Sequence, residues 1–438
     1  MAEIVAVTNI DEKTMLTLDQ WVMRIEAMHP ENIALGLDRI QKVKARLGIA
    51  FTCPIVIVGG TNGKGSTCMM LETIWKTAGY KVGQYTSPHI HRFNERIRID
   101  GKMVDDVTLV QSFERVEAAR RDIPLTFFEF TTLVAMKLFA DAQLDVAIFE
   151  VGLGGRLDAV NILDADVAIV TNVDIDHVAF LGDTKEKIGF EKAGIYRCGK
   201  TGIYGDINPP QSLLAHAKAI GTHLKLYGQD YQGIIDGKTW HYQGPDQTVL
   251  WELPMPALYG KHQIVNAATV LTAVHELQDR LPVYTESIFD ALPKVCLPGR
   301  FEIIHRNPTV IIDVAHNPHA AQVLANNLKM LPCSGKTSAV YGAMADKDIV
   351  GVLRILKDLI DDWYITDLPL PRAISADVLL EKLLMLGVPR TQITVCQKAE
   401  EALRCAQKNA MNDDRIVAFG SFWVATGVTE DTMLIKAD

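Results

Sequence analysis

Short apolar runs rich in valine and isoleucine alternate with longer segments of helical periodicity along most of the chain. In the first two thirds, the runs that predict strands are residues 56–58, 80–85, 146–150, 167–170 and 201–204. Several of these runs are apolar throughout, as is typical of strands that are covered on both faces. Because segments of helix length separate most of them, this pattern predicts a parallel α/β sheet.

A second series of runs begins after a break rich in proline and glycine at residues 295–302. It comprises residues 310–313, 338–341, 363–365, 393–395 and 416–419. Segments of helix length again separate them, which predicts a second parallel sheet. A chain of 438 residues also exceeds what one core usually supports. We therefore expect two domains, residues 1–296 and 297–438.

The remaining helical patterns cover residues 16–47, with a break near His29 and Pro30, residues 107–121, a segment that ends near Phe139, and residues 258–277. Between residues 208 and 256 the pattern weakens to short β-like runs with turn residues between them. We expect that segment to be peripheral.

A glycine-rich loop follows the first strand. Gly59-Gly60-Thr61-Asn62-Gly63-Lys64-Gly65-Ser66-Thr67 lies between the apolar run and a helical pattern that starts at Met69. Glycines allow backbone N–H groups to turn toward phosphate oxygens, and the lysine and the helix N-terminus add positive charge. A strict Walker A motif would need glycine at Val58 and serine or threonine at Gly65. The loop predicts a bound nucleoside triphosphate, and a purely structural glycine turn is the alternative.

Polar residues also follow three other predicted strands. Ser87 comes after residues 80–85, Glu150 closes residues 146–150 before a glycine turn, and His177 follows residues 167–170. Ligands of parallel sheets bind at the carboxyl ends of the strands. A carboxylate next to a phosphate loop suits magnesium, although Glu150 could instead cap the strand end. In the second sheet, Asp313 to Pro318 follow the first strand in the same way.

Composition limits the possible functions. The net charge of −9 argues against general nucleic-acid binding and against a basic membrane-surface role. The seven cysteines are scattered without a C-x-x-C pair, which is typical of reduced core thiols in a cytoplasm. Neither a signal peptide nor an apolar stretch of membrane-spanning length is visible. We expect a cytoplasmic monomer that binds neither nucleic acid nor membranes.

Five ordered motifs together resemble the folylpolyglutamate synthases, which belong to the Mur ligase superfamily. They are residues 60–66, 86–89, 150–158, 297–301 and 313–318. The resemblance covers nearly the whole chain. Within the family, the chain most specifically resembles the bifunctional bacterial form, which is also a dihydrofolate synthase. The family's loop carries glycine after the lysine, as Gly65 does here. The implied fold is α/β, with an N-terminal P-loop ATPase-like domain and a smaller C-terminal Rossmann-like α/β domain.

The resemblance also implies roles for individual residues. The nucleotide contacts it implies are Thr61, Asn62, Gly63, Lys64, Gly65, Ser66, Asn266, Arg300 and Asp313. The metal ligands are Ser87, Glu150, His177 and Lys192, for two Mg²⁺ ions. The substrate-binding residues are Ile33, Leu35, Thr126, Phe127, Phe128, Glu129, Leu157, Asp158 and Ala159. The catalytic set is Lys64, His177, Lys192, Asp313 and His316.

Lys192 receives two different interpretations. From the sequence pattern alone it is a solvated charge on a short helical segment. The resemblance instead matches it to a lysine that the family carbamylates, a modification that turns a cation into an oxygen ligand for magnesium.

The implied reaction is an ATP-dependent amide ligation that adds L-glutamate to dihydropteroate and to reduced folates through an acyl phosphate. Ala34 stands where related bifunctional enzymes carry an acidic residue, so the pteroate contact there is open. The alternatives are a monofunctional folylpolyglutamate synthase and another Mur-type amino-acid ligase. A muramyl ligase would usually carry a UDP-binding domain, whereas about 50 residues precede the phosphate loop. A P-loop kinase or switch and an ATP-binding structural module are further alternatives.

Overall fold

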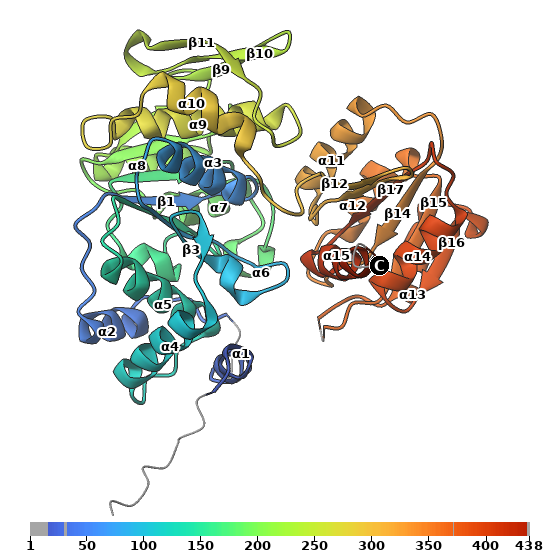
Figure 1. Cartoon of the computed structure of the whole chain (residues 1–438), viewed down its shortest axis with the longest axis horizontal. Coiled ribbons are helices and arrows are strands. Elements are labelled where there is room, and N and C mark those ends of the chain that lie inside the picture. The colour runs from blue at the N-terminus through green and yellow to red at the C-terminus, as the bar shows by residue number, and fades with distance from the viewer. Residues whose placement is uncertain (1–15, 30–32, 371, 436–438) are drawn as a thin grey trace, which may run out of the picture.

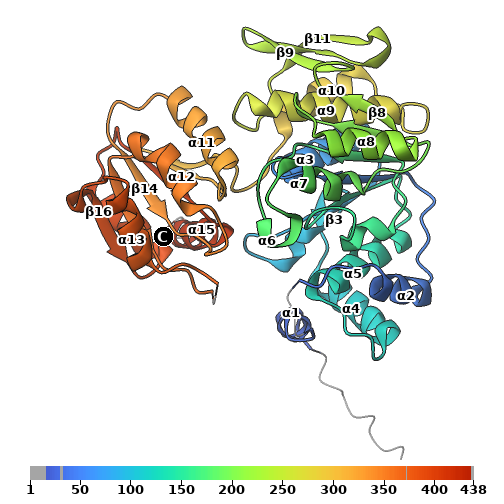
Figure 2. The same cartoon turned by 180° about the vertical axis from the view of Figure 1, so that it is seen from behind.

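A computed structural model describes residues 16–29, 33–370 and 372–435 of the chain. Two sheets with separate helical layers lie side by side (Figures 1 and 2). The predicted α/β fold class is confirmed. The predicted boundary between residues 296 and 297 remains a prediction.

The N-terminal sheet has eight strands in the order β4-β3-β2-β5-β1-β6-β7-β8. They are β1 (Ile55–Gly59), β2 (Val82–Tyr85), β3 (Ile97–Ile99), β4 (Lys102–Met103), β5 (Val146–Glu150), β6 (Val167–Val170), β7 (Thr201–Tyr204) and β8 (His223–Leu226). All pairs from β2 through β8 are parallel, whereas β3 and β4 are antiparallel additions at one edge. The sequence pattern missed these two short strands.

Helices cover both faces of this sheet. They are α1 (Leu18–Glu26), α2 (Asp38–Leu47), α3 (Lys64–Thr77), α4 (Asp106–Arg120), α5 (Phe127–Asp141), α6 (Val178–Leu181), α7 (Lys185–Ala193), α8 (Gln211–Ile220), α9 (His262–Glu276) and α10 (Thr285–Ala291). Successive side chains of a strand point to opposite faces. Accordingly, Ile57 of β1 packs in the core under α4, α5 and α7, while Val56 and Val58 pack under α3 and α9. This burial on both faces explains why β1 is apolar throughout.

The segment predicted to be peripheral is better integrated than expected. It contains helix α8 and the edge strand β8 of the main sheet. A separate antiparallel sheet follows, with strands β9 (Gln232–Asp236), β10 (Thr239–Gln243) and β11 (Val249–Pro254). Its inward side chains, such as Trp240, pack on α9. The helical pattern over residues 16–47, with its predicted break near His29 and Pro30, is confirmed as two helices, α1 and α2, and Pro30 itself lies outside the described residues.

The C-terminal sheet has the order β12-β13-β17-β14-β15-β16. Its strands are β12 (Glu302–Arg306), β13 (Thr309–Ile312), β14 (Thr337–Tyr341), β15 (Asp362–Thr366), β16 (Ile393–Cys396) and β17 (Arg415–Phe419). Its helices are α11 (Pro318–Met330), α12 (Ile349–Leu356), α13 (Ala376–Met385), α14 (Ala399–Asn409) and α15 (Phe422–Ile435). The expectation of a purely parallel sheet is wrong at one edge, because β12 runs antiparallel to β13.

Two further observations bear on the expectations from composition. All seven cysteines are free, but only Cys68 and Cys396 are buried and Cys198 and Cys296 are exposed, so most are not core thiols. Within the described ranges, every helix falls short of the length and apolar character needed to cross a bilayer.

Candidate functional site

The phosphate loop joins β1 to α3 and depends on glycine at two positions. Gly60 has a φ of +141°, and a Cβ added there would overlap the Oγ1 of Thr171 at the end of β6. That hydroxyl donates a hydrogen bond to the carbonyl of Asn62 at 2.6 Å. Gly63 is the N-cap of α3 with a φ of +84° and makes no side-chain capping bond. The first amides of α3 are therefore free of a side-chain cap, as a phosphate site at a helix N-terminus requires.

Lys64 is the first residue of α3 and folds back over the loop. Its Nζ donates to the carbonyl oxygens of Gly60 at 3.1 Å and Thr61 at 3.2 Å. Burial lowers the pKa of Lys64, and the nearby carboxylate of Glu150 opposes that shift. The ammonium group is thus held where phosphate oxygens would meet the loop amides.

A cavity of about 280 Å³ opens beside this loop, between the two sheets. Ten of the predicted site residues line this cavity: Thr61, Asn62, Gly63, Lys64, Ser87, Glu150, His177, Lys192, Arg300 and His316. Ser87 and Glu150 come from neighbouring strands, β2 and β5, and meet directly. The backbone N–H of Ser87 donates to Oε2 of Glu150 at 3.0 Å.

The Glu150 carboxylate fits a hard cation. The residue is buried, and burial raises its pKa, while Lys64 and the Ser87 N–H group lower it. In the described part of the chain, that N–H group is its one hydrogen-bond donor, which leaves most of its oxygen lone pairs for a ligand. Mg²⁺ prefers such oxygen ligands. Clusters of three or more histidine, cysteine, aspartate or glutamate side chains suited to a metal are not found among the described residues.

Lys192 is buried, contrary to the interpretation from the sequence pattern alone. It lies on α7, is 4% exposed, and its side chain makes no hydrogen bond or ion pair within the described ranges. Close packing of the loop after β5 against α7 creates this burial. Arg156 N–H donates to the carbonyl of Glu191 at 2.8 Å, and a Cβ added at Gly155 would lie 2.7 Å from the same oxygen. Burial lowers the pKa of Lys192 to about 7, so a neutral, nucleophilic amine is accessible.

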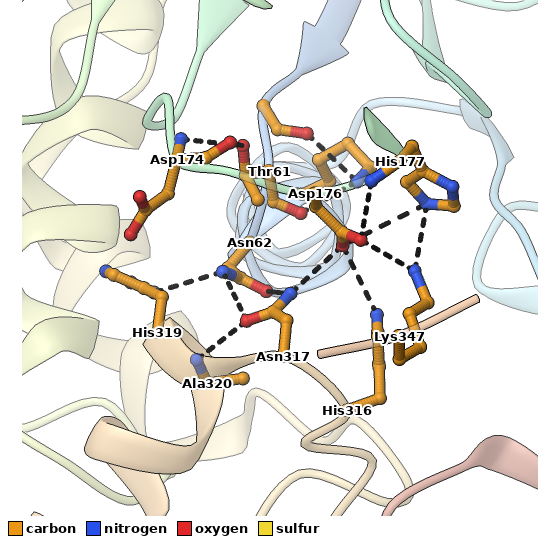
Figure 3. A network of polar contacts seen from close by, with 12 residues as sticks. Thr61, Asn62, Asp174, Asp176, His177, His316, Asn317, His319, Ala320 and Lys347 are labelled. Carbon is orange, nitrogen blue, oxygen red and sulfur yellow. Dashed lines mark hydrogen bonds and ion pairs between the residues drawn. The ribbon is translucent and has the colours of Figure 1, made fainter. Parts of the chain in front are cut away.

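Asp176, which follows β6, binds residues from both domains (Figure 3). Its Oδ1 accepts from Nζ of Lys347 at 2.7 Å, and its Oδ2 accepts from Nδ2 of Asn317 at 3.1 Å. His316 Nε2 lies 3.7 Å from Oδ2, and His177 Nε2 lies 3.9 Å from it. Burial alone would raise the pKa of Asp176, but these partners hold it well below its usual range.

His177 stays neutral in this setting. Burial lowers its pKa to about 4, and the positive charge of Lys347 adds to that effect. A neutral imidazole is the form that binds metal ions. The phosphate loop joins the same network, because the amides of Asn62 and Asn317 exchange hydrogen bonds at 3.2 and 3.4 Å and Asn62 Nδ2 lies 3.0 Å from His319 Nδ1 (Figure 3).

A second cavity of about 160 Å³ lies on the other side of the phosphate loop. Its lining includes Ser66, Asn266, Arg300 and Asp313 from the predicted nucleotide set. Asn266 lies against the loop, since a Cβ added at Gly63 would be 3.0 Å from its Oδ1. Arg300 lines both cavities, whereas Gly65 lines neither.

Asp313 holds the start of the C-terminal domain in shape. Its carboxylate accepts the N–H groups of Phe301 at 2.9 Å and Ala315 at 2.7 Å. Burial raises its pKa, and the positive charge of Arg300 lowers it.

The predicted acceptor-binding segments lie together outside both cavities. Thr126 caps α5, and Glu129 completes the capping box and pairs with Arg39 at 3.1 Å. Arg39 also donates to the carbonyl of Ala34 at 2.6 Å, which brings the segment of Ile33 and Leu35 to the same wall. The other members of this set that the cavities do not include are Phe127, Phe128, Leu157, Asp158 and Ala159.

The loop after β5 connects this wall to the first cavity. The ring of Phe128 covers Gly152, where an added Cβ would lie 2.6 Å from its Cζ. The Asp158 carboxylate accepts the N–H groups of Leu153 at 2.8 Å and Val160 at 3.0 Å, and burial raises its pKa to about 7. In this structure Asp158 shapes the loop, and a substrate contact remains a prediction.

Sequence reasoning missed three residues of this region: Asp176, Lys347 and Arg39. Asp176 could have been found, because it follows β6 beside His177. Lys347 follows β14 in the second sheet, the equivalent strand-end position. Arg39 gave no signal, since a basic residue on an amphipathic helix is normally solvent-exposed.

The chain matches known families over both domains. Residues 58–274 match the Mur ligase middle domain, and residues 299–422 match the Mur ligase glutamate ligase domain. The dihydrofolate synthase/folylpolyglutamate synthase of Escherichia coli is 43% identical over 414 residues, which is 94% of this chain and 95% of that protein.

Solved structures agree with this assignment. Escherichia coli FolC in complex with DHPP and ADP superimposes with a TM-score of 0.91 at 41% identity, over 97% of this chain and 99% of that one. A bifunctional folylpolyglutamate synthase/dihydrofolate synthase with Mn, AMPPNP and L-glutamate bound gives 0.88 at 40% identity, over 95% and 98%. The fold and site thus define a Mur-type ligase. Within that class, the chain belongs to the dihydrofolate synthase/folylpolyglutamate synthase family.

Proposed function

We propose that this protein is an ATP-dependent carboxylate–amine ligase that adds L-glutamate to dihydropteroate and to reduced folates. One observation carries the proposal: the phosphate loop, the buried groups Glu150 and Lys192, and the cross-domain network of Asp176 surround a single cavity between the two sheets. An acyl-phosphate reaction needs these three features together. These features are a phosphate site, polar groups that neutralise charge, and a second domain that can position the attacking amine.

The chemistry proceeds in two steps. A substrate carboxylate attacks the γ-phosphorus of ATP, so that a C–O–P bond forms and ADP leaves. The glutamate amine then attacks the acyl carbon, loses a proton and expels inorganic phosphate. The loop amides and Lys64 bind the phosphate oxygens and counter the charge that develops on them. The protein mainly positions the reacting groups, because little covalent chemistry is left to its side chains.

Ser87, Glu150, His177 and a modified Lys192 would hold two Mg²⁺ ions. Magnesium would supply charge neutralisation at the β- and γ-phosphates. The neutral form of Lys192 can add CO₂ to give a carbamate, and its burial without a partner supports that modification. Two oxygens of a carbamate would then stand where an ammonium would repel a cation.

The domain arrangement suits an intermediate that water would hydrolyse. Asn317 and Lys347 reach from the C-terminal domain to Asp176, so the cavity is closed on that side when the domains are together. Closure of this kind excludes water from an acyl phosphate. Asn266, Arg300 and Asp313 would bind the nucleotide at the second cavity. A monomeric state and a cytoplasmic location remain predictions.

The test uses purified protein with ATP, Mg²⁺ and radiolabelled L-glutamate. Separate reactions contain dihydropteroate, a reduced folate or a UDP-linked muramyl precursor as the acceptor. We expect glutamate incorporation with dihydropteroate and with the reduced folate.

The pattern of acceptors separates the alternatives. Incorporation with the reduced folate alone would indicate a monofunctional folylpolyglutamate synthase. Incorporation with the muramyl precursor alone would indicate another Mur-type ligase. No incorporation with any acceptor, despite ATP binding, would overturn the proposal.

A further inference from the structure

A short loop connects Ser87, a predicted metal ligand that lines the cavity, to the C-terminal domain. This bridging loop, Pro88–Arg92, follows Ser87 directly and leads into a 3₁₀ turn at Phe93–Arg96. The carboxylate of Glu95 accepts three consecutive backbone N–H groups from it, those of residues 90, 91 and 92, at 2.7, 2.8 and 2.7 Å. Three hydrogen bonds to one carboxylate hold the backbone of the loop together as a unit.

Ile90 is partly buried and packs against the core of the other domain. It contacts the hydrophobic cluster between the C-terminal sheet and α14 and α15, which includes Val314 and Val424. Among the described residues before position 295, Ile90 is the one hydrophobic residue that packs against that cluster. The fit is tight, since a Cβ added at Gly299 would lie 3.0 Å from its Cδ1.

Two threonines of α15 add polar contacts to the same loop. Thr426 Oγ1 donates to the carbonyl of Ile90 at 2.6 Å. Thr429 Oγ1 lies at hydrogen-bond distance, 2.9 Å, from Nε2 of His91. Two side chains of α15 therefore hold the loop, one at the backbone carbonyl of Ile90 and the other at the side chain of His91.

The other end of the loop fixes Ser87. Only two residues separate Ser87 from Ile90, and the second of them, His89, accepts a hydrogen bond on Nδ1 from Nε of Arg96 at 2.7 Å. Ser87 N–H in turn donates to Glu150 at 3.0 Å. A shift of Ile90 would therefore move Ser87 relative to the carboxylate beside it.

We propose that the bridging loop couples domain closure to the position of Ser87 beside Glu150, with Ile90 and Thr426 as positioning residues. The proposal rests on the ligase function above. When Ile90 packs against the C-terminal core, Ser87 is held beside Glu150 and the cavity is closed. When the domains separate, the loop loses its contacts with the C-terminal domain, and Ser87 is no longer held beside Glu150. Closure and assembly of the site are thus one event.

The test compares Ile90→Ala and Thr426→Val with the unmodified protein. Thr426→Val keeps the shape of the side chain and replaces the hydroxyl with a methyl group, so it remains informative if Ile90→Ala folds poorly. Ile207→Ala is the matched control, because Ile207 is 62% exposed on a loop of the N-terminal domain. Hydrogen exchange is followed by mass spectrometry in the presence of AMPPNP and Mg²⁺. Phosphate release and amide formation are measured in parallel under turnover.

We expect peptides covering residues 87–96 and 422–429 to exchange faster together in both variants, while the control matches the unmodified protein. We expect kcat to fall about tenfold for Ile90→Ala and less for Thr426→Val. More phosphate should be released per amide bond, because an open cavity lets water reach the acyl phosphate. A merely unfolded fraction would lower both products equally and leave that ratio unchanged.

Two results would overturn the coupling. One is a change in exchange confined to residues 422–429, with residues 87–96 unaffected. The other is an unchanged phosphate-to-amide ratio in both variants. Failure of the ligase function is distinguishable, since unmodified protein would then form no amide with any acceptor, while the exchange comparison would still report whether the two segments move together.

Discussion

Two sheet edges face each other across the cavity, and they position their functional groups in different ways. On the N-terminal edge the backbone has the main role: glycines, uncapped amides and the tightly packed loop after β5 determine where Lys64, Glu150 and Lys192 lie. On the C-terminal edge, long polar side chains such as Lys347 and Asn317 reach across to Asp176.

The difference follows from burial. The groups of the N-terminal edge are fixed inside one domain, where desolvation shifts their pKa values and each close contact is part of the core. The groups of the C-terminal edge gain their partners only when the two domains meet. We therefore expect substitutions on the first edge to abolish function and substitutions on the second edge to reduce it.

Gly60→Ala should have the largest effect. A methyl group there would overlap the hydroxyl of Thr171, and the φ of +141° is unfavourable for alanine. We expect a loss of stability of about 3 kcal/mol and ATP binding weakened by more than about 100-fold. Denaturant unfolding and calorimetric titration with ATP would measure the two effects.

Gly36→Ala is the control for backbone strain alone. Gly36 has a φ of +144°, close to that of Gly60, but an added Cβ would meet nothing within 4 Å. It should lose about 1 to 2 kcal/mol and bind ATP normally. If the two variants were equally destabilised, the contact with Thr171 would not be what requires glycine at position 60.

Lys192→Ala should have the next largest effect. We expect ligase turnover to fall on the order of 100-fold, with ATP affinity nearly unchanged, because the role proposed for this lysine is in metal binding and not in nucleotide binding. Short carboxylic acids should restore part of the activity by replacing the carbamate oxygens. Lys187→Ala on the same helix is the control, since that lysine is exposed and should be dispensable.

The pH dependence of the unmodified protein gives an independent check on Lys192. A lysine with a pKa near 7 is mostly neutral at pH 8 and mostly protonated at pH 6, and only the neutral amine adds CO₂. A carbamate signal from ¹³C-bicarbonate should thus grow as the pH rises through about 7. Stability without CO₂ should also rise between pH 7 and 10.5, where the unfolded chain binds the additional proton. A signal that is independent of pH in this range would contradict the carbamate proposal.

Much of the N-terminal edge could be predicted from sequence, because buried strands are apolar throughout and their carboxyl ends carry the polar residues. Ser87, Glu150 and His177 were found in this way. The burial of Lys192 could not be, since it depends on how Gly155 and the loop after β5 pack against α7. A local pattern records only that the lysine is on a short helix.

The C-terminal edge was less predictable for a different reason. The pairing of Lys347 with Asp176 depends on how two domains approach each other, and neither local sequence encodes that orientation. The antiparallel strand β12 was missed because its side chains are only partly buried and give no strong apolar run. Short edge strands such as β3 and β4 leave even less of a pattern.

Asp176→Asn should have the smallest of the three effects, and it tests the contacts that side chains of the C-terminal edge make across the cavity. Asparagine keeps the size of the side chain, but one of its two polar atoms becomes a donor. Since Lys347 and Asn317 both donate to Asp176, one of them would then face an N–H group, and Lys347, whose side chain is only 9% exposed, would lose its counter-charge. We expect kcat/KM for glutamate to fall by about tenfold, with ATP binding changed far less.

Asp174→Asn separates this effect from a general loss of negative charge near the phosphate loop. Asp174 pairs with Lys185, whose side chain is 57% exposed, and such surface pairs contribute little. That variant should stay within about twofold of the unmodified protein, as judged by steady-state kinetics with glutamate and ATP varied separately. Equal losses in the two variants would mean that the negative charge of the loop after β6 matters more than the contacts of Asp176 with the C-terminal domain. In that case the two edges would not differ in the way proposed, and the contribution of the C-terminal domain would have to come from the nucleotide side, through Arg300 and Asp313.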